Sequence, residues 1–374
     1  MAEEGAFVSN CGENTNCEQA KENEKKASES NFEKGLFEDT GVMTDFDTAA
    51  VFVPKGFTEK GYTEMCEIKK SAKASGISLI CVATSSLLLG IIIAIVLRNS
   101  GINLDQIEKI LSSTAFNALI QVFFTTLAFV ICFAGVFKLN KIYISELISF
   151  KNPEKGTFLP FFLIGFAFCA FANMATSFSG WIFDLLGIDY NVTQNESPEG
   201  FFGFMISTLS VAVLPALAEE FACRGLIMGS LKKYGNGFAV MVSSILFGIL
   251  HGNFQQMPFA FLVGLAVGYA VIKTGSIWTG IIIHFANNFL SVGLDYGLEN
   301  ADIVVKNIII TLLFTTMLLF GMVGLFILKK RNIDFDFEKT QTDISEKEKY
   351  KCFFTGATVI IAISLFVLES FLYF

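Results

Sequence analysis

Nine apolar runs, most of them long enough to cross a lipid bilayer, occupy the chain from about residue 76 to its end. They cover about 76–97, 117–137, 157–184, 201–223, 238–252, 256–272, 276–294, 307–328 and 352–374. A transmembrane helix needs roughly 20 predominantly apolar residues. The fifth and sixth runs are shorter, so we expect them to be tilted, broken or buried within a bundle. The pattern predicts an all-α, polytopic transmembrane helical bundle of about nine spans.

The first 75 residues have the opposite composition, being rich in Glu, Lys, Asn and Ser with few apolar clusters. Such a segment cannot bury enough apolar surface to offset the entropy of ordering it. We therefore expect residues 1–75 to form an acidic, largely disordered tail and residues 76–374 to form a membrane-embedded helical domain. The tail holds 15 Asp and Glu against 9 Lys, which is −6 of the formal charge of −8. The membrane domain is thus close to neutral, which argues against nucleic acid as a partner.

Lysine and arginine set the predicted orientation, because they accumulate on the cytoplasmic side of membrane spans. The opening segment MAEEGAFVSN lacks the basic and apolar regions of a secretory signal peptide, so the amino terminus is expected in the cytoplasm. Nine alternating spans then leave only Arg98, Lys109 and Lys306 outside, together with the carboxyl terminus. The prediction is an integral, multi-pass membrane protein, in the plasma membrane if the chain is bacterial.

The segment ALAEEFACRG, residues 216–225, places three charged side chains inside the fourth apolar run. A charge at the centre of a membrane helix costs about 2.5–3.5 kcal/mol, so an ionisable cluster there indicates function by default. Arg224 is four residues after Glu220 and shares a helix face with it, which allows an ion pair. Glu219 points about 100° away from Glu220 and remains available for chemistry. The alternative is that all three side chains anchor the helix at the membrane interface.

Pro215 interrupts the same run four residues before Glu219. Because proline lacks an N–H group, it should kink the helix or free a backbone carbonyl at that point. Irregular backbone at membrane depth usually faces protein or a water-filled cavity. We therefore expect this part of the span to face protein or such a cavity.

The chain has only two histidines, His251 and His284, and both fall inside apolar runs. A lone histidine on an apolar face is more often a hydrogen-bonded core residue than a catalytic one. Here, however, both histidines and the carboxylate pair lie within about 70 residues of one another. His284 and Asn288 are four residues apart on one helix face, where an imidazole and an amide could donate hydrogen bonds to a developing oxyanion.

Three short motifs follow one another on successive predicted helices: EEFACR fits EExxxR, FGILH fits FxxxH, and HFANN fits HxxxN. Their order, together with the two-histidine content, resembles the CPBP family of CAAX prenyl endopeptidases and bacteriocin-processing or abortive-infection membrane proteins. The resemblance implies a helical bundle with a cytoplasm-facing catalytic cavity and a protease-like core at about 157–294. It also implies a hydrolase, a metalloendopeptidase-like intramembrane protease that cleaves a membrane-associated peptide or protein substrate.

Six motif residues gain roles from this resemblance: Glu219, Glu220, Arg224, His251, His284 and Asn288. The first glutamate would activate the attacking water, and the first histidine would help to position that water. The second histidine and the asparagine would stabilise the tetrahedral oxyanion. The second glutamate and the arginine would shape the site.

A zinc ion is one open question, because Glu219, His251 and His284 are the ligand types of a catalytic zinc site with an open fourth position. The compact HExxH motif is absent, and a site that used Glu219 as a ligand would leave Glu220 as the base. We favour a metal-independent glutamate mechanism slightly over a zinc site.

Two other classes of function remain open. A proton-coupled transporter could use the same ionisable residues as a relay, although no second copy of the cluster marks an internal repeat. A catalytically idle membrane scaffold or immunity protein could also retain the motifs.

Overall fold

The computed structural model describes residues 42–44, 51–54, 56–99, 114–188, 190 and 198–373. The chain divides into two units, Met1–Tyr62 and Thr63–Phe374. In the first unit, strand β1 (Val42–Thr44) pairs in antiparallel register with strand β2 (Val51–Val53). Most of the predicted disordered tail lies outside the described residues.

The first long helix, α2 (Glu59–Asn99), begins inside the segment that the sequence predicted to be disordered. Described helix therefore extends to the amino-terminal side of the tail boundary expected at residue 75. The polar part of this helix is ordered by contacts with a segment distant in the sequence. The carboxylate of Glu64 accepts hydrogen bonds from the backbone N–H groups of Asp343 and Ile344, at 3.0 and 3.4 Å. Composition alone could not indicate these partners.

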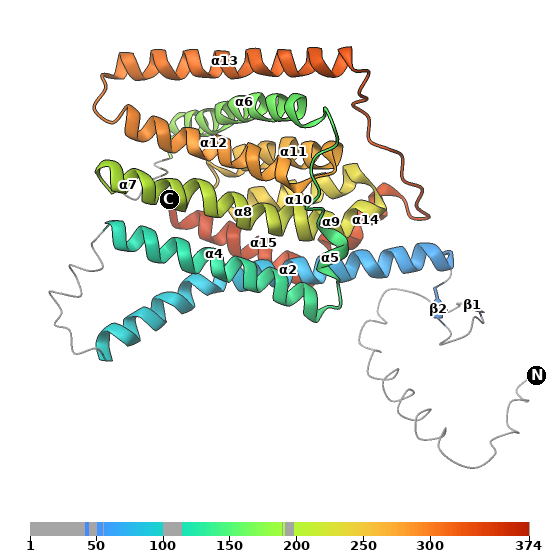
Figure 1. The fold of residues 1–374 in the computed structure, drawn as a ribbon. Coiled ribbons are helices and arrows are strands. Elements are labelled where there is room, and N and C mark those ends of the chain that lie inside the picture. The colour runs from blue at the N-terminus through green and yellow to red at the C-terminus, as the bar shows by residue number, and fades with distance from the viewer. Residues whose placement is uncertain are drawn as a thin grey trace, which may run out of the picture. The chain divides into compact units, whose positions relative to one another are not determined.

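The remaining described elements of the second unit are helices that lie side by side, with α13 and α4 on opposite flanks of α8, α11 and α12 (Figure 1). In chain order they are α4 (Thr114–Leu139), α5 (Ile144–Leu147), α6 (Phe158–Leu185), α7 (Gly200–Ser207), the π-helix η2 (Thr208–Val213), α8 (Leu214–Glu220), the π-helix η3 (Phe221–Met228), α9 (Gly229–Leu231), the short 3₁₀ helix η4 (Lys232–Tyr234), α10 (Asn236–Leu250), α11 (Met257–Thr274), α12 (Ile277–Gly297), α13 (Ile303–Lys330), α14 (Glu346–Phe354), α15 (Ala357–Ser370) and the 3₁₀ helix η5 (Phe371–Tyr373).

Five stretches of described helix are long and apolar enough to cross a membrane. They are Phe158–Leu185, Gly200–Tyr234, Met257–Thr274, Ile277–Gly297 and Ile303–Lys330. Helices α14 and α15 would add a sixth if they form one span bent by 68°. Each of the nine predicted runs coincides with helix, but α10 has only 15 residues. The structure therefore supports an integral membrane protein with five to six candidate spans, and nine crossings stay a prediction.

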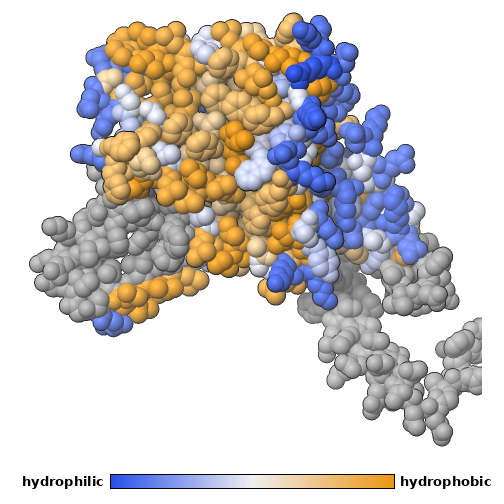
Figure 2. Space-filling view, viewed as in Figure 1, coloured by the Kyte–Doolittle hydropathy of each residue, from blue (hydrophilic) through white to orange (hydrophobic). Residues whose placement is uncertain are grey.

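The surface of the bundle matches a membrane environment. Figure 2 shows hydrophobic side chains over most of the face formed by α13, α12, α7 and α8, and hydrophilic side chains gathered at the end that carries α9 and α14. Many large apolar side chains of α13 are exposed, among them Leu312 at 62% and Phe326 at 67%. In water such a surface would be unfavourable, whereas lipid chains can cover it.

Segments predicted to be cytoplasmic meet at this hydrophilic end. The backbone N–H of Glu154, before α6, donates to the carbonyl of Thr274 at 3.1 Å. Arg331, after α13, donates to the carbonyl of Gly156 at 2.6 Å. Lys273 reaches the carbonyl of Asp334 at 2.9 Å, in the loop between α13 and α14. The packing of these segments at one end is thus consistent with the alternating direction of the spans that the lysine and arginine distribution predicts. Their cytoplasmic location stays a prediction.

Small residues allow α10 and α11 to pack closely where they support the site. A Cβ atom on Gly264 would lie 3.0 Å from the Cα of Ser244, and one on Gly248 would lie 3.0 Å from the carbonyl oxygen of Met257. Membrane helices use such small residues to bring their backbones together, because lipid provides no hydrophobic driving force between helices. This packing places Phe247 and the carbonyl of Gly264 beside the charged residues of the neighbouring span.

Candidate active site

Helix α8 carries Glu219 and Glu220 in its last turn, between the π-helices η2 and η3. Pro215 lies at the start of α8 and has no N–H to offer the carbonyl of Val211, four residues earlier. The side-chain amide of Asn288, on α12, donates to that carbonyl at 2.9 Å. The irregular backbone predicted from Pro215 is therefore present, and it faces protein.

Glu220 and Arg224 form the ion pair that their spacing predicts. Nη1 of Arg224 donates to Oε1 of Glu220 at 2.8 Å, and neither side chain is accessible to solvent. Nη2 donates to the carbonyl of Gly264 at 3.2 Å, and the guanidinium carbon lies 4.5 Å from the centre of the Phe247 ring. An interfacial anchor keeps its charged group in water, so that alternative does not describe this pair.

Helix α12 approaches the pair closely at Gly280. A Cβ atom there would lie 2.9 Å from Oε2 of Glu220 and 2.7 Å from Cγ2 of Val271. Among the described residues, this carboxylate oxygen has no hydrogen-bond partner. Gly280 therefore provides the space in which the buried carboxylate packs against α12.

His284, on α12, lies between the two glutamates. Its Nδ1 is 2.9 Å from Oε1 of Glu220, and its Nε2 is 3.8 Å from Oε2 of Glu219. Because an ionised carboxylate can only accept a hydrogen bond, Nδ1–H donates to Glu220. The edge of the imidazole that carries Nε2 is thereby directed toward Glu219. The sequence paired His284 with Asn288 alone and did not indicate this link between α12 and α8.

Glu219 differs from its neighbour in both exposure and partners. Its side chain retains 21% of its accessible surface, against 0% for Glu220. In the part of the chain that the structure describes, no group donates a hydrogen bond to Glu219. The 3.8 Å separation from His284 exceeds an ordinary hydrogen bond. Its carboxylate oxygens are therefore available to a ligand, whereas Glu220 is held in place.

His251 terminates α10, and its ring has a defined tautomer. Nδ1 lies 2.9 Å from the carbonyl oxygen of Phe247, which can only accept, so Nδ1 carries a proton, and in the neutral ring Nε2 then holds the lone pair. The Phe247 ring packs edge-on against both histidines, with centroids 5.0 Å from His251 and 5.7 Å from His284. Phe247 therefore connects the two histidines of the candidate site.

Asn288 has a structural role in addition to the predicted one. One of its two amide N–H groups is engaged by Val211, and its carbonyl oxygen accepts from Nδ2 of Asn287 at 3.1 Å. These two bonds fix the orientation of the amide. One N–H remains for an oxyanion. The neighbouring Asn287 thus helps to orient Asn288.

Glu219, His251 and His284 are the candidate zinc ligands that the sequence offers. Among the described residues, no group of three or more His, Cys, Asp and Glu side chains could hold a metal ion. Nδ1 of His284 is engaged by Glu220, which leaves Nε2, at 3.8 Å from Oε2 of Glu219, as its open ring nitrogen. The metal-independent mechanism stays a prediction.

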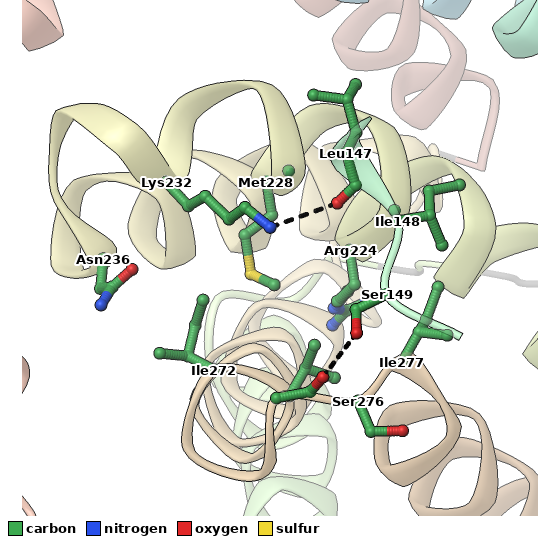
Figure 3. Close-up of a pocket in the computed structure, with 14 residues that line it drawn as sticks. Leu147, Ile148, Ser149, Arg224, Met228, Lys232, Asn236, Ile272, Ser276 and Ile277 are labelled. Atoms are coloured by element: carbon green, nitrogen blue, oxygen red, sulfur yellow. Dashed lines mark hydrogen bonds between the residues drawn. The ribbon is translucent and has the colours of Figure 1, made fainter. Parts of the chain in front are cut away.

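A cavity of about 190 Å³ lies beside Arg224, between η3 and the turn that joins α11 to α12 (Figure 3). At its rim, Lys232 donates to the carbonyl of Leu147 at 3.4 Å, and Ser149 donates to the carbonyl of Gly275 at 2.8 Å. Its lining includes neither Glu219 nor a histidine. This cavity therefore borders the ion pair and not the available carboxylate, which differs from the catalytic cavity that the resemblance implied.

Comparison with known protein families gives a match in the middle of the chain. Residues 201–290 match the family model described as type II CAAX prenyl endopeptidase Rce1-like. The match contains all three motifs, and it confirms the resemblance to the CPBP and CAAX family of intramembrane proteases. Comparisons with curated proteins and with solved structures gave no match. The family implies a protease, and hence a hydrolase with a peptide or protein substrate.

Proposed function

We propose that this chain, with its CAAX-type protease core, is an intramembrane endopeptidase in which Glu219 activates the attacking water. The observation that carries the proposal is the unequal environment of two adjacent carboxylates. Glu220 is fully buried and bonded to both Arg224 and His284, whereas Glu219 is partly exposed and carries no hydrogen bond from a described group. A general base must be free to accept a proton, and of these two carboxylates only Glu219 meets that condition.

Water activation would use Glu219 together with His251. The carboxylate of Glu219 accepts one proton from the water while the oxygen of that water bonds to the scissile carbonyl carbon. The lone pair at Nε2 of His251 accepts a hydrogen bond from the other O–H and orients the attack. The defined tautomer of His251 supports this role, because Nδ1 already donates to Phe247.

The oxyanion would be stabilised from α12. If His284 takes a second proton from solvent before the attack, it donates from Nε2 to the oxyanion while Nδ1–H remains bonded to Glu220, whose charge stabilises the imidazolium, and it keeps that proton through the turnover. Asn288 contributes its remaining N–H. The protonated Glu219 then returns its proton to the leaving amine as the C–N bond breaks, so the base is regenerated at the end of each turnover.

The substrate would be a membrane-associated peptide or protein. The exposed apolar surface of the bundle is consistent with a lipid bilayer around the site (Figure 2). We propose that the amino terminus of the chain lies in the cytoplasm, as the lysine and arginine distribution predicts.

Proteomics of membrane fractions tests the function even while the substrate is unidentified. Cells that express the wild type, Glu219→Gln or the surface control Glu338→Gln are compared for newly formed peptide termini. The proposal expects fragments that disappear only with Glu219→Gln. If the same termini persist in all three, a membrane scaffold is favoured over a protease.

Metal dependence is tested separately on the purified protein. We propose that cleavage needs no metal, so activity should survive dialysis against a zinc chelator, and stoichiometric zinc should be absent by mass spectrometry. Loss of activity that added zinc restores would instead favour a metalloprotease, with Glu219, His251 and His284 as candidate ligands.

A further inference from the structure

The turn between α10 and α11 fixes the position of His251, and a buried asparagine organises that turn. Asn253 is only 3% exposed. Its Oδ1 accepts hydrogen bonds from the backbone N–H groups of Gln255 at 2.9 Å and Gln256 at 3.3 Å. This arrangement is an Asx turn, which replaces helix hydrogen bonds where the chain changes direction. The residues after His251 are therefore held by a side chain and not only by the helix.

Tyr190, from the segment between α6 and α7, packs against the same turn. Its hydroxyl accepts from the backbone N–H of Phe254 at 2.8 Å and lies 3.2 Å from Oδ1 of Asn253. Its ring stacks on Phe183, with centroids 4.7 Å apart. Burial raises the pKa of the Tyr190 phenol, so the hydroxyl keeps the proton that it needs to donate.

The carboxyl-terminal helix contacts the turn as well. The Tyr190 hydroxyl is 3.5 Å from the carbonyl oxygen of Ser370, and Phe254 packs edge-on against Phe371 at 5.3 Å. Gly252 has φ of +56°, and a Cβ there would lie 2.9 Å from the carboxylate of Glu369. The turn is thus enclosed by elements that lie before and after the family match at 201–290.

We propose that Asn253 and Tyr190 are positioning residues for the reaction, which hold His251 in place by fixing the α10–α11 turn. The proposal rests on the proposed function of His251. Residues at the end of a helix lack part of its hydrogen bonding, so their position depends on what caps them. A displacement of about 1 Å at a reacting group can cost roughly 100-fold in rate. Tyr190 and the last helix then belong to the catalytic apparatus without touching substrate.

The test uses three variants of the full chain in detergent or liposomes, with a cleavage that Glu219→Gln abolishes as the assay. Asn253→Ala removes the acceptor, Asn253→Asp keeps an oxygen in the same place, and Tyr190→Phe removes a single hydroxyl. Tyr143→Phe, at an exposed tyrosine on the same chain, is the control. Melting temperatures are recorded for all four.

The proposal expects kcat to fall about 10- to 100-fold in Asn253→Ala and Tyr190→Phe, with KM and melting temperature little changed. Asn253→Asp should recover most of the rate, and Tyr143→Phe should equal the wild type. Unchanged kcat in a folded Tyr190→Phe variant would overturn the proposal, as would an effect confined to KM.

Hydrogen exchange provides a readout that does not depend on activity. Backbone amides of residues 251–257 should exchange faster in both Asn253→Ala and Tyr190→Phe than in the wild type. If the wild type shows no cleavage that depends on Glu219, the proposed function fails. Exchange then decides the positioning claim alone, and unchanged protection would overturn it.

Discussion

The guanidinium of Arg224 bonds Oε1 of Glu220 at 2.8 Å, and both side chains are completely buried. Two opposite charges removed from water in this way depend on each other, because either one alone would be an uncompensated charge in a low-dielectric interior. Oε1 of Glu220 also accepts from His284, so the pair supports one of the histidines of the site. The arginine therefore acts on both stability and chemistry.

Arg224→Ala should destabilise the protein by about 3–5 kcal/mol, because it strands Glu220. The double variant Glu220→Gln with Arg224→Gln should recover much of that loss, since neither charge then remains. Thermal melts in detergent measure both changes. A fully stable Arg224→Ala variant would show that water or lipid headgroups reach Glu220.

Gly280→Ala should also destabilise, for a steric reason. The added methyl would meet Val271 and the unpaired oxygen of Glu220, and overpacking of this kind costs about 1–3 kcal/mol. Gly293→Ala is the matched control on the same helix, because a Cβ there meets nothing within 4 Å. It should be neutral or stabilising by up to about 1 kcal/mol. Equal melting temperatures for the two variants would contradict the close approach of α12.

Much of this site follows from local spacing. The four-residue interval between Glu220 and Arg224 predicted the ion pair, and Pro215 predicted irregular backbone. Both inferences depend on helix geometry alone. By contrast, the link between His284 and Glu220 joins residues 64 positions apart, and no periodicity encodes which helices become neighbours.

In the fold, too, local features could be predicted from the sequence and contacts between distant segments could not. Hydropathy located every long helix in the described part of the chain, because apolar length is a local property of the sequence. It missed the helical start of α2, whose order depends on Glu64 binding the loop before α14. It also missed Asn253, although that residue closely follows the FxxxH motif, because only its contact with Tyr190 distinguishes it from a loop asparagine.

The charged start of α2 gives a prediction about pH. Burial acts to raise the pKa of Glu67, but hydrogen bonds from Lys233 and Tyr234 outweigh it and lower the pKa below its usual value of 4.5. The contact therefore stabilises the folded state above about pH 4.5 and is lost as the pH falls through the lowered value. Glu67→Gln should reduce the melting temperature at pH 7, only slightly because the pair is partly solvated, and the difference should shrink as the pH falls through the lowered pKa. A difference that grows on acidification would contradict this sign.

Single-cysteine labelling tests the predicted orientation. In a cysteine-free background, Lys347→Cys and Asn300→Cys lie at exposed positions in segments predicted to be inside and outside. An impermeant reagent added to intact cells should label position 300 at once and position 347 only after lysis. The reverse pattern would show that the predicted topology is inverted.

The central claim is that Glu219 is the base and Glu220 its buried neighbour, and cleavage rates of two isosteric variants test it most directly. Glu219→Gln keeps shape and should leave the melting temperature unchanged, while kcat falls at least about 100-fold because the proton acceptor is lost. Glu220→Gln should lower the melting temperature, since Arg224 loses its counter-charge, and should retain more activity than Glu219→Gln under conditions where it is folded. Wild-type turnover by Glu219→Gln, together with a stable and inactive Glu220→Gln, would show that the two carboxylates have the opposite roles.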